Sequence, residues 1–261
     1  MDGSMFTGHS FISKHSAAST NRLVATLSTS LAPAVLSVQT VSDLLRKASL
    51  RNKELEEKLS AQRSSLICAF TQLLDLKDLN TGVHSTRLAE WGLRVGQELG
   101  LGEEDLQDLE VTALLHDIGK VGIPDAILRK PSRLDEEEYA LMKKHPEYGW
   151  AVLRMLPGFD RAALYTLHHH EAFDGRGYPA GLKGLEIPIA SRIVSVIDAF
   201  DAMVSSRPYR KGLPFEEASR RLIEASGSQF DTCVVQSFLK FAHAEIDTVF
   251  AAAGTALSSA L

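Results

Sequence analysis

The chain has 261 residues, a formal net charge of −5, a sequence pI near 6.0 and 44% hydrophobic residues. This length accommodates one large domain or two small ones, and the apolar fraction is sufficient for a sizeable core. The acidic balance offers no basic face to a nucleic acid polymer, which we therefore exclude as a partner, although a metal site could still attract a small anion. Two cysteines without a disulfide pattern fit a reducing cytoplasm.

The first 34 residues are rich in Ser, Thr and small side chains and show no clear period. We expect residues 1–34 to be disordered or leave them unassigned. Residues 23–38 come closest to a targeting or membrane segment, but Pro33 and several hydroxyl side chains interrupt them. We therefore expect neither a membrane span nor a signal peptide.

Residues 35–65 are predicted to form a helical linker, because apolar side chains recur there at alternating steps of three and four. The positions of this heptad stripe are Val38, Val41, Leu45, Ala48, Asn52, Leu55, Leu59, Gln62, Leu66 and Ala69. The pattern is typical of a coiled coil and suggests a homodimer through residues 38–69. Two polar residues and only about four heptads leave an equal alternative, an amphipathic helix packed on its own domain.

Beyond Leu66 the apolar residues follow helical spacing, and convincing runs with a period of two are absent. The expected helices cover residues 85–99, 103–115, 135–144, 149–156, 162–169, 189–204, 215–226 and 232–250. The sequence therefore predicts an all-α fold. Residues 251–261 are left as a tail.

Histidines are concentrated in the middle of the chain, at positions 84, 116, 145, 168, 169 and 170. A single buried histidine is more often a hydrogen-bonded core residue than a ligand, but this clustering favours a metal site. Carboxylates that could bind a metal or orient an imidazole are Asp117, Asp174, Asp198 and Asp201. Both cysteines lie far from these motifs, so nitrogen and oxygen ligands suited to iron, manganese, zinc or nickel are expected.

Five ordered motifs resemble those of the HD-GYP family, a subgroup of the HD metal-dependent phosphohydrolases. They are HDIGK (116–120), HPEYG (145–149), HHEAFDGRGYP (169–179), DAFDAM (198–203) and RPYR (207–210). The resemblance covers residues 66–250. It implies an HD-type helical bundle with additional C-terminal helices, preceded by the long N-terminal helix.

The resemblance also implies two divalent metal ions per chain, iron or manganese before other transition metals. One set of ligands would be His84, His116, Asp117 and Asp198, and the other would be Asp117, His145, His169 and His170. Asp117 would bridge the two ions, which together would activate a hydroxide nucleophile.

Substrate contacts follow from the same resemblance. Lys120 is a catalytic candidate together with Asp117, and it would contact the phosphate if the helix continues one turn beyond His116. Tyr178 would seat a base, and Arg207 and Arg210 would bind phosphate or guanine edges. Each of these cations could instead be a solvated surface residue.

Several positions depart from the ligand pattern or flank it. Asn80 stands where some family members carry a glutamate that recruits a third metal, so we expect two ions. Thr232 replaces a common proline and should change only a helix start. His168 is not expected to be a ligand, and Glu171 is expected to support the ligands through hydrogen bonds.

The sequence thus predicts an enzyme, a cytoplasmic cyclic di-GMP phosphodiesterase that forms pGpG and could continue to GMP. One alternative is a phosphodiesterase for another cyclic dinucleotide, such as 3′,3′-cyclic GMP-AMP. The other is a catalytically weak nucleotide-binding signalling module, against which the intact ligands and Lys120 argue.

Overall fold

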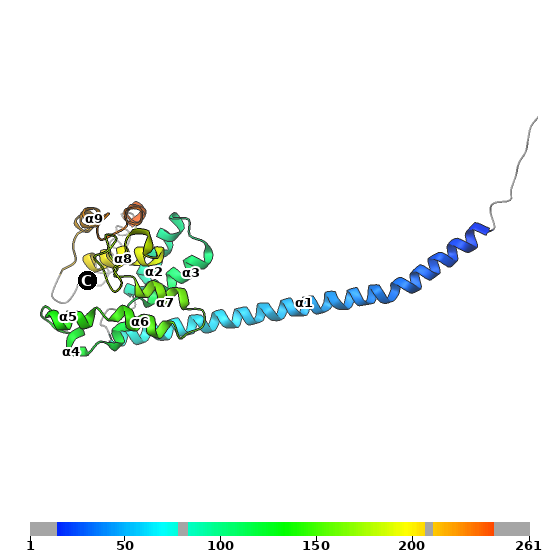
Figure 1. The fold of residues 1–261 in the computed structure, drawn as a ribbon, viewed down its shortest axis with the longest axis horizontal. Coiled ribbons are helices and arrows are strands. Elements are labelled where there is room, and N and C mark those ends of the chain that lie inside the picture. The colour runs from blue at the N-terminus through cyan, green and yellow to red at the C-terminus, as the bar shows by residue number, and fades with distance from the viewer. Residues whose placement is uncertain (1–14, 78–82, 207–210, 243–261) are drawn as a thin grey trace, which may run out of the picture. The chain divides into compact units, whose positions relative to one another are not determined.

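The computed structural model describes residues 15–77, 83–206 and 211–242, and their side chains from residue 37 onward with the exception of residue 83. The chain divides into two compact units, residues 1–63 and residues 64–261. The described residues contain no β-strand, only an isolated bridge between Ser226 and Phe230. The all-α prediction is confirmed (Figure 1).

The helices follow one another with short connections. In chain order they are α1 (His15–Lys77), α2 (Val83–Glu98), α3 (Glu103–Leu115), α4 (Asp125–Leu128), α5 (Glu136–Met142), α6 (His145–Leu153), α7 (Asp160–Leu167), α8 (Ile189–Val204) and α9 (Phe215–Glu224). Two 3-10 helices, η1 (Ile118–Gly122) and η2 (Gly184–Glu186), interrupt the series, and residues 232–242 are helical. Asp231 begins this last helix by accepting the backbone N–H of Cys233 at 2.8 Å, as expected for a changed helix start beside Thr232.

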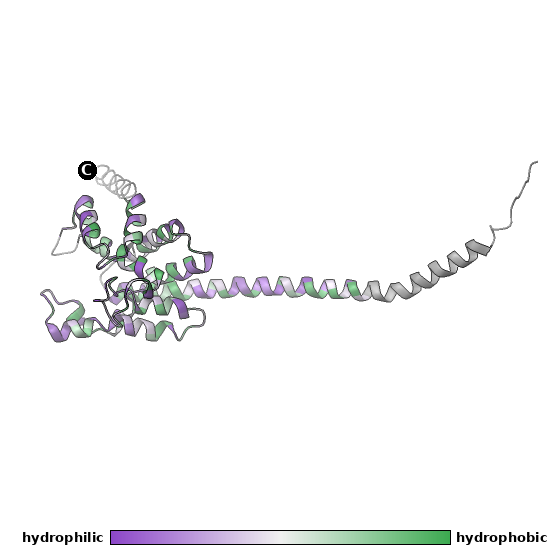
Figure 2. Cartoon of the chain, turned by 45° about the horizontal axis from the view of Figure 1, so that its top comes forward, coloured by the Kyte–Doolittle hydropathy of each residue, from purple (hydrophilic) through white to green (hydrophobic). Residues whose placement is uncertain are grey.

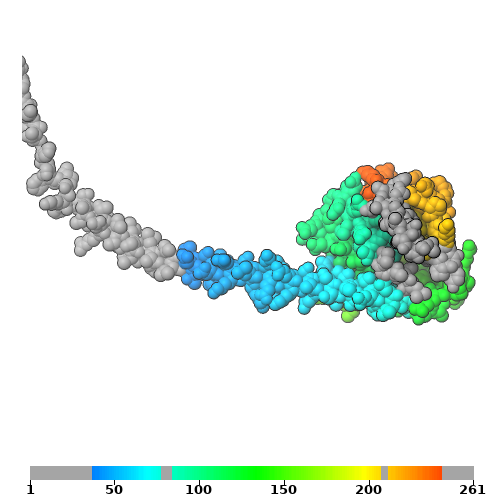
Figure 3. Space-filling view, turned by 180° about the vertical axis from the view of Figure 1, so that it is seen from behind, coloured from blue at the N-terminus to red at the C-terminus, as the bar shows by residue number. Residues whose placement is uncertain are grey.

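The first unit contains the N-terminal part of α1. Residues 15–34, which we expected to be disordered or unassigned, are helical in the structure because their many Ala and Leu residues favour a helix. Every described side chain from residue 37 to residue 62 is exposed, including Leu45 at 66% and Leu59 at 64%. Hydrophobic and hydrophilic residues alternate along this stretch (Figure 2), and Figure 3 draws its atoms as blue spheres.

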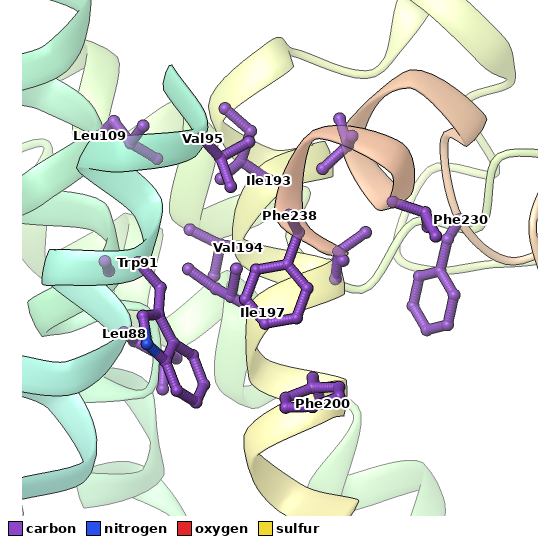
Figure 4. Close-up of a cluster of buried hydrophobic side chains, with 14 of the residues drawn as sticks. Leu88, Trp91, Val95, Leu109, Ile193, Val194, Ile197, Phe200, Phe230 and Phe238 are labelled. Carbon is purple, nitrogen blue, oxygen red and sulfur yellow. The ribbon is translucent and has the colours of Figure 1, made fainter. Parts of the chain in front are cut away.

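The larger core of the second unit lies between α2, α8, α9 and residues 232–242. The ring of Trp91 on α2 meets the edges of Phe200 and Phe238, with ring centroids 5.9 and 5.4 Å apart. Figure 4 shows Ile193, Val194 and Ile197 on the side of α8 that faces α2. Because α8 is apolar on this face, the acidic residues near its end are directed to another part of the unit.

A second core holds the segment that follows α3. Its buried members are Leu74, Val111, Leu115, Ile118, Leu153, Phe159, Ala162 and Ala163, with Ile67 and Phe70 packed against them. The last turns of α1 therefore belong to the same apolar cluster as Ile118 of η1. Polar contacts reinforce this junction, since Lys77 is paired with Asp125 and its backbone carbonyl accepts a hydrogen bond from Arg129 at 3.3 Å.

Among the helices of the described residues, none is both long enough and apolar enough to cross a membrane.

Candidate metal centre

The seven predicted ligands come from separate elements that meet at one place in the second unit. His84 lies in the first turn of α2, and Asp198 lies in the second half of α8. The other five side chains stand at or next to helix ends: His116 and Asp117 after α3, His145 at the start of α6, and His169 and His170 after α7. The structure brings all seven together.

The first group consists of His84, His116 and Asp198, whose ligand atoms lie within 4.8 Å of one another. Oδ1 of Asp198 is 3.6 Å from Nε2 of His84 and 3.9 Å from Nε2 of His116. Two imidazole nitrogens and a carboxylate oxygen therefore converge on a space large enough for one cation.

The second group consists of His145, His169 and His170. The Nε2 atoms of His145 and His169 are 3.3 Å apart, and the ring centroids of His169 and His170 are 4.0 Å apart. Three imidazoles this close would repel one another if they were protonated, so the arrangement suits neutral rings that share a metal ion.

Asp117 joins the two groups. Its Oδ2 atom is 3.4 Å from Nε2 of His116, and its Oδ1 atom is 3.3 Å from Nε2 of His145. Burial alone would raise the pKa of Asp117, but the charges of Lys120 and His116 hold it well below the ordinary value. A permanently ionised carboxylate with one oxygen toward each group has the form of a bridging ligand.

Three of the histidines are oriented by the same local hydrogen bond. In each case Nδ1 hydrogen-bonds to the backbone carbonyl three residues earlier, in the last turn of the preceding helix. The pairs are His116 with Ala113 at 3.0 Å, His145 with Met142 at 2.8 Å and His169 with Thr166 at 2.6 Å. The last carbonyls of a helix lack intrahelical donors, so each imidazole satisfies one of them and leaves its Nε2 atom free as a ligand.

His84 is oriented by a carboxylate instead. Its Nδ1 atom is 2.5 Å from Oδ2 of Asp201, a buried residue one turn after Asp198 on α8. Oδ1 of Asp201 also accepts a hydrogen bond from Nε of Arg87 at 2.6 Å. Asp201 is therefore a hydrogen-bond partner of a ligand, one of the two roles expected for it.

The protonation states fit a metal site. Burial lowers the pKa values of His145 and His169, and burial followed by the charge of His145 lowers the pKa of His170 to about 3. Burial opposes the charge of His116 too, but Asp117 and Asp198 outweigh it and raise the pKa of His116 to about 9. Nε2 of His116 is nevertheless buried without a hydrogen-bond partner among the described residues. A cation in place of its proton would satisfy this nitrogen, so the residues present fit a metal ion.

Lys120 reaches the centre by a different route from the one expected. The α-helix ends at Leu115 and does not continue past His116, because η1 begins at Ile118. The tighter 3-10 turn still places Nζ of Lys120 2.7 Å from Oδ2 of Asp117. Lys120 therefore lies beside Asp117, although the condition set for it, a helix that continues past His116, is not met.

Gly119, inside the HDIGK motif, has a packing role that we did not predict. A Cβ atom at this position would lie 1.9 Å from the carbonyl oxygen of His145 and 2.4 Å from the backbone nitrogen of Gly149. Only glycine lets η1 approach α6 this closely. This contact sets the distance between Asp117 and His145, so Gly119 belongs to the framework of the centre.

The loop after His170 is held in place by hydrogen bonds to Glu171. Its buried carboxylate accepts the backbone N–H groups of Ala180, Gly181 and Leu182 at 2.8, 3.0 and 3.2 Å. Glu171 also contacts Nδ1 of His168 at 3.3 Å, so it organises the loop instead of supporting the ligands as expected. The non-ligand role of His168 agrees with its position outside both groups.

The predictions for Asp174 and Tyr178 have different outcomes. Asp174, considered as a possible ligand, is paired with Arg176 and lies outside both groups because the loop turns it away. The ring of Tyr178 lies against that of His170, with centroids 5.0 Å apart and an angle of 31° between the planes. Burial raises the pKa of the Tyr178 hydroxyl, and Tyr139 and Asp117 raise it further, so it remains a hydrogen-bond donor.

Predictions for Asn80, Arg207 and Arg210 fall outside the described residues.

Two histidine-containing groups joined by one aspartate inside a helical bundle define a metal-binding protein of the HD type. The model of the HD domain matches residues 69–234, and the chain belongs to this family. The motifs and the relatives below confirm the resemblance to its HD-GYP members.

Three relatives illustrate the similarity. A cyclic di-GMP phosphodiesterase of Thermotoga maritima is 40% identical over 205 residues, which cover 77% of this chain and 56% of the relative. The crystal structure of a cyclic GMP-AMP specific phosphodiesterase of Vibrio cholerae, V-cGAP3, matches with a TM-score of 0.56 and 25% identity over 69% of this chain and 48% of that chain. An HDG"Y"P protein of Bdellovibrio bacteriovorus shares the fold, with a TM-score of 0.50 and 24% identity over 61% of this chain and 51% of that chain. The chain spans about half the length of each relative.

Proposed function

We propose that this chain is a metal-dependent phosphodiesterase that hydrolyses cyclic di-GMP to pGpG. The observation that carries the proposal is Asp117, which presents one carboxylate oxygen to each histidine-containing group. The identity to the cyclic di-GMP phosphodiesterase of Thermotoga maritima supports the choice of substrate.

We assign two divalent cations to the centre, one to each group, with iron or manganese favoured by the nitrogen and oxygen donors. Bound there, they supply Lewis acidity that offsets the charge of the phosphodiester and acidifies water. The protein supplies oriented Nε2 atoms, because the Nδ1 atoms are held by carbonyls and by Asp201.

Lys120 supplies a fixed positive charge beside Asp117. In the reaction its ammonium contacts a non-bridging phosphate oxygen and stabilises the charge that develops during attack. Tyr178, held against His170, offers an aromatic surface to a base. Arg207 and Arg210 remain predicted contacts to phosphate or guanine.

A second substrate has specific support, since the Vibrio cholerae structure is named as specific for cyclic GMP-AMP. To decide, the protein would be purified anaerobically, its metals quantified, and the products from cyclic di-GMP, 3′,3′-cyclic GMP-AMP and cyclic di-AMP identified by mass spectrometry. We expect pGpG as the first product, and the same experiment shows whether GMP follows. Turnover of 3′,3′-cyclic GMP-AMP alone would replace the substrate, and bound but intact nucleotide on metal-loaded protein would favour the signalling module.

We also propose that the heptad stripe pairs two copies of the chain in parallel. The described positions of the stripe up to residue 62 are exposed, and Asn52 would face Asn52 of the second copy, which fixes the register. Leu45→Lys should convert the dimer to a monomer in light scattering. Leu50→Lys is the matched control, because Leu50 is 61% exposed but lies off the stripe. A monomeric wild-type chain at micromolar concentration would contradict this proposal.

A further inference from the structure

Lys143 and Tyr139 form a wall beside the metal centre that no motif suggested. Lys143 follows the last residue of α5, and its Nζ atom lies 5.1 Å from the ring centroid of Tyr139 and 6.0 Å from that of Tyr178. Tyr178 in turn lies against His170 of the second group. The ammonium of Lys143 is therefore only one aromatic ring away from a metal ligand.

This ammonium has an unusual environment for a lysine. Lys143 is half-buried, and no carboxylate pairs with it in the part of the chain that the structure describes. Nearby lysines are paired, Lys130 with Glu138 and Lys144 with Glu147 at 3.0 Å. Two aromatic faces offset only part of the cost of removing an ammonium from water, so the surroundings of Lys143 suit a ligand that brings hydrogen-bond acceptors.

The aromatic surroundings favour a base over a phosphate as that ligand. Tyr139 is 50% exposed, which leaves ring surface open for a flat partner. A purine is the part of a cyclic dinucleotide that stacks on tyrosine rings. The phosphate already has a cation at the metal centre, because Lys120 stands beside Asp117.

We propose that Lys143 is a specificity-determining residue that donates to O6 and N7 of one guanine of the substrate while Tyr139 stacks on that base. Guanine presents two acceptors along this edge, N7 and O6. Adenine keeps the N7 acceptor but carries an amino donor in place of O6, and an ammonium, which only donates, cannot pair with that group. The inference rests on the proposed function and deepens it, because it assigns a preference for guanine to α5.

The test is Lys143→Met, which keeps an unbranched stem on the tyrosine rings and removes the ammonium. Binding of cyclic di-GMP and cyclic di-AMP to the metal-loaded protein would be measured by calorimetry, together with kcat/KM for cyclic di-GMP. We expect affinity for cyclic di-GMP to fall roughly tenfold and affinity for cyclic di-AMP to fall clearly less, since guanine loses a contact at O6 that adenine never makes. Metal content should not change. Lys144→Met is the matched control and should behave as wild type, because Lys144 is exposed and pairs with Glu147.

The outcomes separate the two proposals. Equal losses of affinity for both nucleotides would show that Lys143 contacts phosphate. Unchanged binding would show that it contacts neither the base nor the phosphate. Either result overturns the inference. Tyr139→Leu should weaken the binding of both nucleotides, because it removes the stacking surface. Normal binding by this variant would also contradict the proposed role of Tyr139. Wild-type protein that binds cyclic di-GMP through Lys143 but never cleaves it would overturn the proposed function alone.

Discussion

The hydrogen bond between Asp201 and His84 allows a sharp test of how the first group holds its metal. In Asp201→Asn the side chain keeps its shape but loses its charge, and its amide can direct an N–H toward Nδ1 of His84. The imidazole proton would then move to Nε2, the atom that faces Asp198 at 3.6 Å. Burial alone would raise the pKa of Asp201, but His84 and then Arg87 lower it, so the wild-type carboxylate is ionised and accepts from both.

We expect this substitution to weaken metal binding to the first group by about 10- to 100-fold, which corresponds to roughly 1.4–2.7 kcal/mol. The second group should keep its affinity, because its histidines are oriented by backbone carbonyls instead. Metal titration followed by elemental analysis would therefore show, per chain, one ion that is bound more weakly and one that is bound with unchanged affinity.

Asp105→Asn is the control, since it also removes a carboxylate that pairs with an arginine, Arg161, but lies outside both groups. Circular dichroism would establish that both variants are folded. If folded Asp201→Asn bound both ions as tightly as the wild type, the proposed orientation of His84 by Asp201 would be refuted.

Four other predictions follow from the same centre. Asp117→Ala should deplete metal from both groups, as elemental analysis would show, and full metal content would contradict its bridging position. Lys120→Ala should keep the metals but lower kcat by about 10²–10³-fold, and an unchanged rate would make Lys120 structural. Gly119→Ala should destabilise the protein by about 1–3 kcal/mol in denaturant unfolding, because its Cβ would overlap the His145 carbonyl, whereas Gly102→Ala, with no atom within 4 Å of the new Cβ, should cost far less. Metal-free protein should lose stability as the pH falls below 6.5, because His170 has a pKa of about 3 when folded and takes up its proton only on unfolding. The expected loss of unfolding free energy is about 2 kcal/mol at about pH 5. A constant melting temperature from pH 7 to 5 would contradict this prediction.

Six of the seven predicted ligands fall within contiguous motifs and could be placed from the sequence, whereas His84 lies in none of these motifs and followed only from the family resemblance. The way in which the ligands are oriented could not be predicted. The expected helices over residues 135–144 and 162–169 extended past the true ends at Met142 and Leu167, which concealed the carbonyls that hold His145 and His169. A histidine placed just after a helix is the signal that could have revealed this arrangement.

Contacts between distant parts of the chain were also beyond the reach of sequence patterns. Asp201 and His84 are 117 positions apart and meet only because α8 packs on α2 through the larger core. Lys143 lies in no motif, and a lysine after a helix ordinarily indicates a solvated surface. Its significance comes from two tyrosine rings, one of which is contributed by a loop beyond α7.

The apolar cluster shared by the last turns of α1 and η1 limits how this HD domain can be excised or fused to other modules. The family match begins at residue 69, yet Ile67 already packs against the core that contains Ile118. Ile118 directly follows Asp117 and is separated from Lys120 by Gly119 alone, so a fragment that begins after α1 would lose apolar cover from the cluster beneath this segment. Any input domain joined through α1 would enter through a helix whose final turns already belong to this core, and a rotation of those turns would move Leu74 within the cluster that also holds Ile118.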